Sequence, residues 1–218
     1  IIRGNSPKGL LWRMEGIEIP NPNHFGDGQG STSGIISMIN STSLANSDFM
    51  SGAFPAEYGN ASSGVFDLRF RRGNNEKREY MAQLSVVGID LAAEGPMGKL
   101  GGSYRVGARY STLELLLKSG LVNINSGSFK PAYRDFNYTI DIPLKKAGNL
   151  SFWGLMGAND TEDEKATSKD YSNGLMGAFG ISHKLPMKKG HLSTNAAFTV
   201  ESTRISKDEI IATLWKNT

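Results

Sequence analysis

The sequence contains no cysteine among its 218 residues, which excludes disulfide frameworks, thiolate metal sites and cysteine nucleophiles. No apolar run approaches 18 residues, so a transmembrane helix is excluded as well. An excess of one charge is also missing, because 24 Lys and Arg against 21 Asp and Glu leave a formal net charge of +3. That excess is too small to indicate nucleic-acid binding by electrostatic attraction alone. A membrane-spanning β-strand remains compatible with these absences, since its apolar residues alternate with polar ones.

Motifs for catalysis and for cofactors are missing too. Residues 59–64 have the glycine spacing of a phosphate-binding loop, but Val65 and Phe66 stand where Lys and Ser or Thr would bind phosphate and magnesium. The three histidines have no partner at metal-ligand spacing. The sequence has no nucleophile elbow and no HExxH motif. We therefore expect a protein that is not an enzyme, with no cofactor and no metal site.

Two compositional regimes divide the chain. Residues 1–73 are rich in Gly, Ser, Asn and Pro, with short apolar runs between turn signals, which is typical of a compact, loop-rich small domain. A charged seam over residues 69–79 marks the boundary. Beyond the seam, apolar and polar residues alternate with period two, which predicts β-strands with one apolar and one polar or small face.

The alternation is clearest in residues 103–111, where tyrosine, valine and alanine alternate with serine, arginine and glycine. The apolar set changes phase near Val87 and Gly88, which predicts a tight hairpin or bulge there. Residues 150–158 are apolar on both faces, so the pattern does not orient them. The other alternating segments are residues 136–142, 174–182 and 192–201.

The connections between the predicted strands alternate in length. Short turns are predicted over residues 94–99, 145–149 and 186–190, and longer polar stretches over residues 112–134 and 159–171. Short turns at one end and long loops at the other are typical of an up-and-down outer-membrane barrel.

The number of strands limits what this chain can form alone. About six or seven strands fit into residues 79–201, whereas a membrane barrel needs at least eight to satisfy every backbone group. We therefore interpret the chain as an internal piece of a longer polypeptide, in which further strands complete the barrel.

Three motifs carry a resemblance to a known family. Residues 52–67, with Tyr58-Gly59 followed by Gly64-Val65, resemble the end of the plug domain in TonB-dependent outer-membrane receptors, particularly the Bacteroidetes-type branch. The opening Arg3-Gly4 and the later Glu15-Gly16 resemble the plug core of that family, with Glu15 where Asp is commoner. Glu94-Gly95-Pro96 and the segment after it resemble the first periplasmic turn and the following barrel strand.

The resemblance implies a mainly β fold: a partial plug domain followed by antiparallel strands of an incomplete transmembrane β-barrel. Residues 1–73 would be the C-terminal part of the plug, and residues 74–218 the first strands of the barrel, about six to eight of the family's 22. The implied function is active uptake of a scarce substrate across the outer membrane of a Gram-negative bacterium, with the plug gating the barrel. The implied partners are the TonB–ExbB–ExbD energy-transducing complex, outer-membrane lipid, and a small substrate such as a siderophore, a glycan or a peptide, with no nucleic acid.

The resemblance also suggests where ligands and contacts would lie. Substrate would bind at the plug apex, in a rigid exposed loop between Asn21 and Gly30. Charged pairs between plug and barrel would hold the plug in place. The candidate ligand-binding residues are Asn23, His24, Phe25 and Asp27, and the candidate plug–barrel contacts are Arg3, Arg69, Arg71, Arg105 and Arg109, with Asp141 and Glu201 as further barrel partners.

Two other classes of function fit the same sequence. A plug-and-barrel relative without transport activity could scaffold an outer-membrane assembly, and an upstream TonB-contacting segment would separate the importer from that scaffold. A soluble β-rich binding module is the third possibility. It predicts that the fragment is monomeric in water, whereas barrel strands without their partners aggregate.

Overall fold

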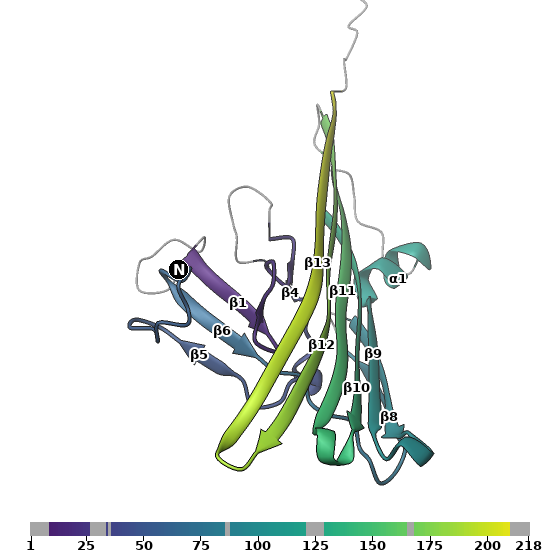
Figure 1. Cartoon of the computed structure of the whole chain (residues 1–218). Coiled ribbons are helices and arrows are strands. Elements are labelled where there is room, and N and C mark those ends of the chain that lie inside the picture. Colours follow the sequence, from purple (N-terminus) through teal and green to yellow (C-terminus); the bar gives the residue numbers. More distant parts are fainter. Residues whose placement is uncertain are drawn as a thin grey trace, which may run out of the picture.

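The computed structural model describes residues 9–26, 34, 36–85, 88–120, 129–164 and 168–209. The protein is mainly β, as the sequence predicted, and an N-terminal part (residues 9–73) lies beside a sheet of long antiparallel strands (Figure 1). Within the described residues, no helix has the length and the apolar character needed to cross a membrane.

The N-terminal part is built on a small sheet with strand order β2-β1-β6-β5. Strand β1 (Leu10–Met14) pairs in parallel with β6 (Gly64–Leu68), which is 54 residues away at the first pair, Leu10 and Gly64. Tyr58 packs with Leu11 and Val65 on one face of this sheet and donates a 3.0 Å hydrogen bond to Asp67. The remaining short elements are β2 (Ile17–Glu18), β3 (Asn23–His24), β4 (Ile36–Ser37), η3 (Ser41–Ser43) and β5 (Asp48–Met50).

The turn between β1 and β2 has the geometry that its sequence favours. Met14 pairs with Ile17, so the turn contains only Glu15 and Gly16, and both residues have positive φ, 52° and 82°. Two-residue hairpins with positive φ at both positions favour Asn-Gly and Asp-Gly. Glu15 adopts this conformation with the support of a 2.7 Å hydrogen bond that its carboxylate accepts from the backbone N–H of Phe70.

The second sheet has seven strands, each paired antiparallel with its neighbours in chain order. Gly88 N–H donates to Ser85 Oγ at 3.0 Å, which closes the hairpin predicted near residues 87 and 88. The strands are β7 (Glu79–Leu84), β8 (Gly88–Pro96), β9 (Ser103–Ser111), β10 (Phe129–Pro143), β11 (Asn149–Glu164), β12 (Ser168–Met187) and β13 (Gly190–Glu209).

The short turns lie where the sequence predicted them, whereas only one of the two expected long connections, the one between β9 and β10, is present. The turns hold η4 (Gly98–Leu100), η5 (Lys145–Ala147) and the β12–β13 connection, all at the lower end of the view in Figure 1. The polar stretch 159–171 was expected to be a loop, yet Asn159 to Glu164 pair in register with Lys169 to Gly174. In the stretch 112–134, helix α1 (Thr112–Lys118) opens the β9–β10 connection, residues 121–128 lie outside the described residues, and β10 begins at residue 129. For residues 159–171 polarity alone was a misleading signal, because charged and polar residues can also pair across neighbouring strands.

The two faces of the seven-stranded sheet have opposite character. In β9, Ser103, Arg105 and Gly107 are buried against the N-terminal part, while Ala108 on the other face is exposed. We call the side turned to the N-terminal part the inner face and the opposite side the outer face. Large apolar side chains are exposed on the outer face, including Leu91, Phe136, Met156, Leu175, Ile181 and Phe198. This is the reverse of a soluble sheet, in which the apolar face is the buried one.

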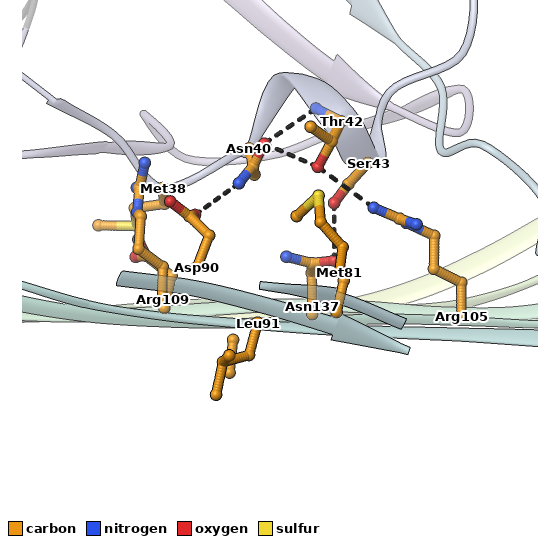
Figure 2. Close-up of a pocket in the computed structure, with 14 residues that line it drawn as sticks. Met38, Asn40, Thr42, Ser43, Met81, Asp90, Leu91, Arg105, Arg109 and Asn137 are labelled. Carbon is orange, nitrogen blue, oxygen red and sulfur yellow. Dashed lines mark hydrogen bonds and ion pairs between the residues drawn. The ribbon is translucent and has the colours of Figure 1, made fainter. Parts of the chain in front are cut away.

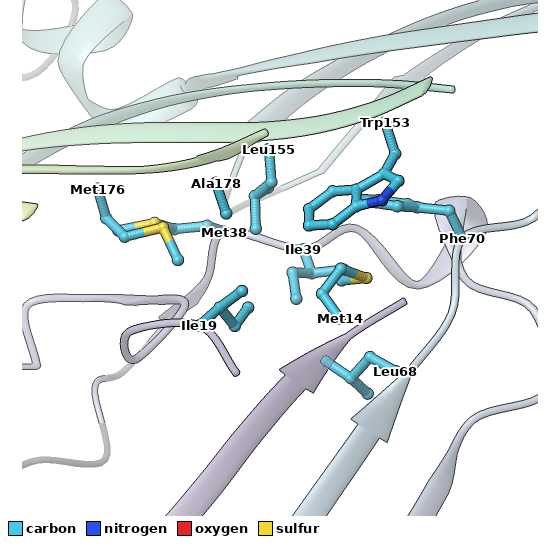
Figure 3. Close-up of a cluster of buried hydrophobic side chains, with 10 residues drawn as sticks. All are labelled: Met14, Ile19, Met38, Ile39, Leu68, Phe70, Trp153, Leu155, Met176 and Ala178. Carbon is cyan, nitrogen blue, oxygen red and sulfur yellow. The ribbon is translucent and has the colours of Figure 1, made fainter. Parts of the chain in front are cut away.

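One apolar cluster on the inner face joins the two parts (Figure 3). Trp153, Leu155, Met176 and Ala178 of β11 and β12 pack against side chains from the N-terminal part. Trp153 and Leu155 therefore point inward and Met156 outward, which orients the segment 150–158 that the sequence left open. The N-terminal members of the cluster are Met14, Ile19, Met38, Ile39, Leu68 and Phe70.

A glycine beside this cluster leads to a first prediction. A Cβ added at Gly180 would lie 2.3 Å from Cζ2 of Trp153, the residue that faces Gly180 across the β11–β12 ladder. Gly180→Ala is expected to displace the indole and to lower the free energy of unfolding by about 1–3 kcal/mol. Thermal unfolding in detergent, followed by tryptophan fluorescence, measures this effect. Gly190→Ala is the matched control, since a Cβ there meets nothing within 4 Å; equal losses for both variants would contradict the prediction.

Candidate functional site

The candidate site is the contact surface between the N-terminal part and the inner face of the seven-stranded sheet, which we call the inter-sheet interface. Beyond the apolar cluster, this interface is made of polar and charged side chains. The N-terminal part contributes His24, Asn40, Thr42, Ser43 and Arg71. The strands contribute Asp90, Glu94, Arg105, Arg109, Asp135, Asn137 and Asn159.

His24 is at the centre of the first polar group. Its side chain is completely buried, and its Nε2 lies 2.5 Å from Oδ1 of Asp135 on β10. Its Nδ1 lies 3.3 Å from Nδ2 of Asn159 on β11, so both ring nitrogens have partners on the strands. The imidazole also packs on Tyr133, with ring centroids 4.9 Å apart.

Arg109 completes this group from the neighbouring strand β9. Its Nε donates to Oδ2 of Asp135 at 2.8 Å, and its terminal nitrogen bonds both Asp135 and the carbonyl oxygen of Ser37 in β4. Asp135 thus accepts hydrogen bonds from His24 of the N-terminal part and from Arg109 of β9. Removing this carboxylate would leave the Arg109 guanidinium without its ion-pair partner.

A second polar group surrounds the short helix η3 (Figure 2). Asn40 caps the helix by accepting from the backbone N–H of Thr42 at 2.9 Å, and it donates to Asp90 of β8 at 2.6 Å. Ser43 donates to Asn137 of β10 at 3.0 Å. The cavity between these residues measures about 10 Å³, close to the smallest space that admits one water. These polar groups therefore bond one another directly.

A third group centres on Glu94 of β8. Arg71 lies 2.9 Å and Arg105 of β9 lies 3.3 Å from the same carboxylate, and Arg105 also donates to the hydroxyl of Thr42 at 3.2 Å. Beside them, Arg72 lies 3.4 Å from Asp141 of β10. Nε of Arg105 is buried and has no hydrogen-bond partner among the described residues. Three separate polar groups thus link the N-terminal part to strands β8 to β11.

The arrangement suits reversible docking better than chemistry. Ion pairs and polar hydrogen bonds that leave water on docking can be rehydrated on release, whereas a wholly apolar interface of the same size would oppose separation. Across the described ranges of the chain, no group of three or more His, Asp or Glu side chains is placed to bind a metal ion.

The structure places the sequence-derived candidates as follows. Arg71, Arg105 and Arg109 lie in the inter-sheet interface. Arg69 is exposed, and Arg3 lies outside the described residues. Of the barrel partners, Asp141 contacts Arg72, and Glu201 is exposed on β13.

The candidate ligand-binding residues are not equally accessible. Asn23 and Phe25 are half-buried, and Asp27 lies outside the described residues. The expected exposure of His24 is wrong, because its ring is sealed between Asp135, Asn159 and Tyr133. Sequence reasoning missed this burial since the partners of His24 are more than 100 residues away in the chain.

Sequence reasoning also missed Asp90, Glu94 and Asp135 as contact residues. The available signal was the alternation itself: Asp135 continues the polar face of Asn137 and Thr139, and Asp90 and Glu94 alternate with Leu91. Carboxylates at inner-face positions next to inner-face arginines could therefore have been proposed as partners of the arginines.

The half-buried turn residue Glu15 leads to a second prediction. Burial raises the pKa of its carboxyl, although the N–H of Phe70 favours the charged form. Because the folded protein then binds this proton more tightly than the unfolded chain, stability falls as the pH rises from 4.5 through the raised pKa. Glu15→Gln keeps the acceptor for Phe70 and removes the ionisation, so its melting temperature in detergent should fall less between pH 5 and pH 7.5 than that of the wild type. Glu18→Gln, at an exposed position in β2, is the control and should retain the wild-type dependence; an unchanged pH dependence in Glu15→Gln would contradict the assignment.

Comparison with known proteins identifies the fold. The sequence matches no family model and no curated protein. Among solved structures, the ferric enterobactin receptor PfeA in complex with BCV-L6 superposes with a TM-score of 0.55 at 16% identity, covering 94% of this chain and 34% of PfeA. A mutant of PfeA from Pseudomonas aeruginosa in complex with enterobactin gives the same values. The siderophore receptor PirA from Acinetobacter baumannii gives a TM-score of 0.46 at 15% identity over 95% of this chain and 38% of PirA.

The chain therefore spans about a third of the length of PfeA and shares the fold of that part. The expected fold class, a mainly β chain in which a partial plug precedes antiparallel barrel strands, is confirmed.

Proposed function

We propose that this chain is part of a TonB-dependent outer-membrane receptor that imports a scarce substrate. In this proposal residues 1–73 are the C-terminal part of the plug, and residues 74–218 are the first strands of a barrel of 22. The observation that carries the proposal is the inverted sheet: its apolar face is exposed, and its polar face is covered by the preceding segment of the same chain.

The outer face supports a lipid environment. Leu91, Phe136, Met156, Leu175 and Phe198 lie on five of the seven strands (β8 and β10 to β13) and are each at least 40% exposed. Monomeric soluble proteins rarely leave so large an apolar surface open to water. Strands β12 and β13 have 20 residues each, more than the 9–11 that a tilted strand needs to cross the hydrocarbon layer. The excess length would extend the barrel wall beyond the membrane.

The inter-sheet interface supports a movable plug. Its ion pairs and hydrogen bonds fix one docked position, and water can replace them when the plug is pulled or remodelled. The TonB–ExbB–ExbD motor would supply the work. The protein would then act as a gated pathway, and none of its described residues would need to take part in a chemical reaction.

The substrate class is the finer part of the proposal. PfeA and PirA are named as receptors for ferric enterobactin and for siderophores, which supports a ferric siderophore ahead of a glycan or a peptide. Asn23, Phe25 and Asp27 would contribute to the substrate site at the plug apex. His24 would position that loop against the barrel wall instead of touching the substrate.

Labelling of a buried interface residue tests this function. Ser43 is 2% exposed, and these 218 residues contain no cysteine, so Ser43→Cys introduces the one thiol of this segment, in the inter-sheet interface; any cysteine elsewhere in the reading frame would be replaced by serine. The full reading frame that contains this chain would be expressed in a Gram-negative host under iron limitation, and the cells would be treated with a membrane-impermeant maleimide with and without ferric enterobactin. Cells without TonB provide the control.

A plug that is moved during import predicts labelling that requires TonB. Labelling at the same low rate with and without TonB would contradict the importer and favour the scaffold. Recovery of the protein from the cytoplasm as a monodisperse monomer would contradict any outer-membrane function.

A further inference from the structure

The short turns at one end of the seven-stranded sheet carry lysines and no carboxylates. The β10–β11 turn contributes Lys145 and Lys146, and the β12–β13 turn contributes Lys188 and Lys189. Because β11 pairs with both β10 and β12, the two turns are neighbours. The ring Nε2 of His183 lies 2.7 Å from the carbonyl oxygen of Ala147 and links them. We call these four lysines the basic rim.

The basic rim is free to meet a partner. All four lysines are exposed, and none has an ion pair within the ranges that the structure describes. The segments 143–149 and 184–191 contain no Asp or Glu. Lys99, in the β8–β9 turn at the same end of the sheet, extends the positive charge by one further strand pair.

The opposite end of the same strands has a different charge pattern. Residues 159–171 contain five carboxylates and two lysines, and the backbone register places both unlike and like charges across from one another, as in Lys130 with Glu162 and Asp163 with Asp170. Acidic residues therefore accompany the basic ones at that end, whereas the turn segments that carry the basic rim contain none.

Apolar side chains border the basic rim on the outer face. Leu144 and Met187 lie within three residues of a rim lysine and are 38% and 55% exposed, and Leu192 of β13 is 50% exposed. Lysine side chains can lay their methylene groups along such a surface and extend the ammonium group toward a neighbouring anion. A partner that fits must therefore offer apolar chains and anionic groups side by side.

We propose that the basic rim binds the phosphodiester headgroups of anionic phospholipids in the membrane leaflet at the short-turn end of the barrel. Leu144, Met187 and Leu192 contact the acyl chains, and Lys145, Lys146, Lys188 and Lys189 contact the phosphates. This inference rests on the proposed function, because it requires the outer face to lie in a membrane. A soluble acidic protein or polymer fits less well, since it would leave the apolar border of the rim uncovered.

Native mass spectrometry of the full-length protein in detergent tests the proposal. The protein would be mixed with phosphatidylglycerol or with phosphatidylcholine of identical acyl chains, and the retained lipid would be counted. The wild type is expected to retain phosphatidylglycerol about tenfold more than phosphatidylcholine. The variant K145Q/K146Q/K188Q/K189Q should lose that preference. The control variant K130Q/K169Q/R204Q/K207Q removes the same charge at the opposite end and should keep it.

Each alternative result has a separate meaning. Equal retention of the two lipids by the wild type would overturn the proposal that the basic rim binds anionic lipid. Equal loss of preference in both variants would overturn it as well. Neither result would contradict the proposed receptor function. If inorganic phosphate at the concentration of the lipid displaces all retained phosphatidylglycerol, the site recognises phosphate alone and needs no acyl chain, which overturns a lipid site. A wild-type protein that is soluble without detergent and retains neither lipid contradicts the proposed function itself. Comparison of melting temperatures shows whether either variant has failed to fold.

Discussion

Asp135→Ala is expected to weaken docking of the N-terminal part by about 3–5 kcal/mol, the cost of leaving a buried charged partner uncompensated. Asp135 is 6% exposed and accepts from both His24 and Arg109, so its removal opens a link between plug and wall and leaves the Arg109 guanidinium without its carboxylate. The measurement is the urea concentration at which Ser43→Cys in the full-length protein becomes reactive toward maleimide. In Asp135→Ala this urea concentration should be lower than in the protein that keeps Asp135, and well below the concentration at which the barrel strands unfold.

Asp160→Ala is the matched control for this variant. Asp160 also pairs with an arginine, Arg134, but both side chains are at least 40% exposed. An exposed pair contributes about 0–1 kcal/mol, so this variant should become reactive at nearly the wild-type urea concentration. If Asp160→Ala weakens docking as much as Asp135→Ala, the buried group around His24 has no special part in docking.

Trp153→Ala is the second variant with a large expected effect. Its indole is 1% exposed and belongs to the apolar cluster that joins β11 to the N-terminal part. Truncation removes the contact with Phe70, whose ring centroid is 6.3 Å away, and leaves a cavity on the inner face. The expected loss is about 3–5 kcal/mol. It should appear both as a lower melting temperature in detergent and as earlier labelling of Ser43→Cys.

Phe136→Ala tests whether the outer face is covered by lipid or packed against protein. Phe136 is an aromatic residue of similar bulk on β10, but it is 41% exposed and points to the outer face. If the outer face lies in lipid or detergent, this truncation should leave plug docking unchanged and lower the melting temperature less than Trp153→Ala. A loss equal to that of Trp153→Ala would mean that the outer face packs against protein, and would contradict the orientation proposed for the sheet.

The alternation of residue types predicted much of the barrel part. The pattern Tyr104, Val106, Ala108 against Ser103, Arg105, Gly107 is a local property of a strand, so it determined both the strand and its two faces. The turns at residues 94–99, 145–149 and 186–190 followed from glycine, proline and lysine at fixed positions. The segment 150–158 was left without orientation, because its inner face meets the apolar cluster instead of the polar part of the interface.

The partners within the inter-sheet interface could not be predicted in the same way. His24 and Asp135 are 111 residues apart, and Asn40 and Asp90 are 50 apart. A loop rich in Asn and Pro indicated exposure for His24, and only the packing of that loop against β10 and β11 reverses this. The polar stretch 159–171 was expected to be a loop for a similar reason: its composition did not reveal the neighbouring strand that pairs with it.

The sequence by itself determined that the second part of this protein is an antiparallel sheet with one apolar and one polar face, because side-chain direction in a strand depends only on odd and even position. The resemblance to plug-and-barrel receptors implied that the polar face is the covered one, and only the tertiary structure decided which carboxylate meets which cation there. Those contacts depend on how distant segments approach in space, and local residue order carries no record of that approach.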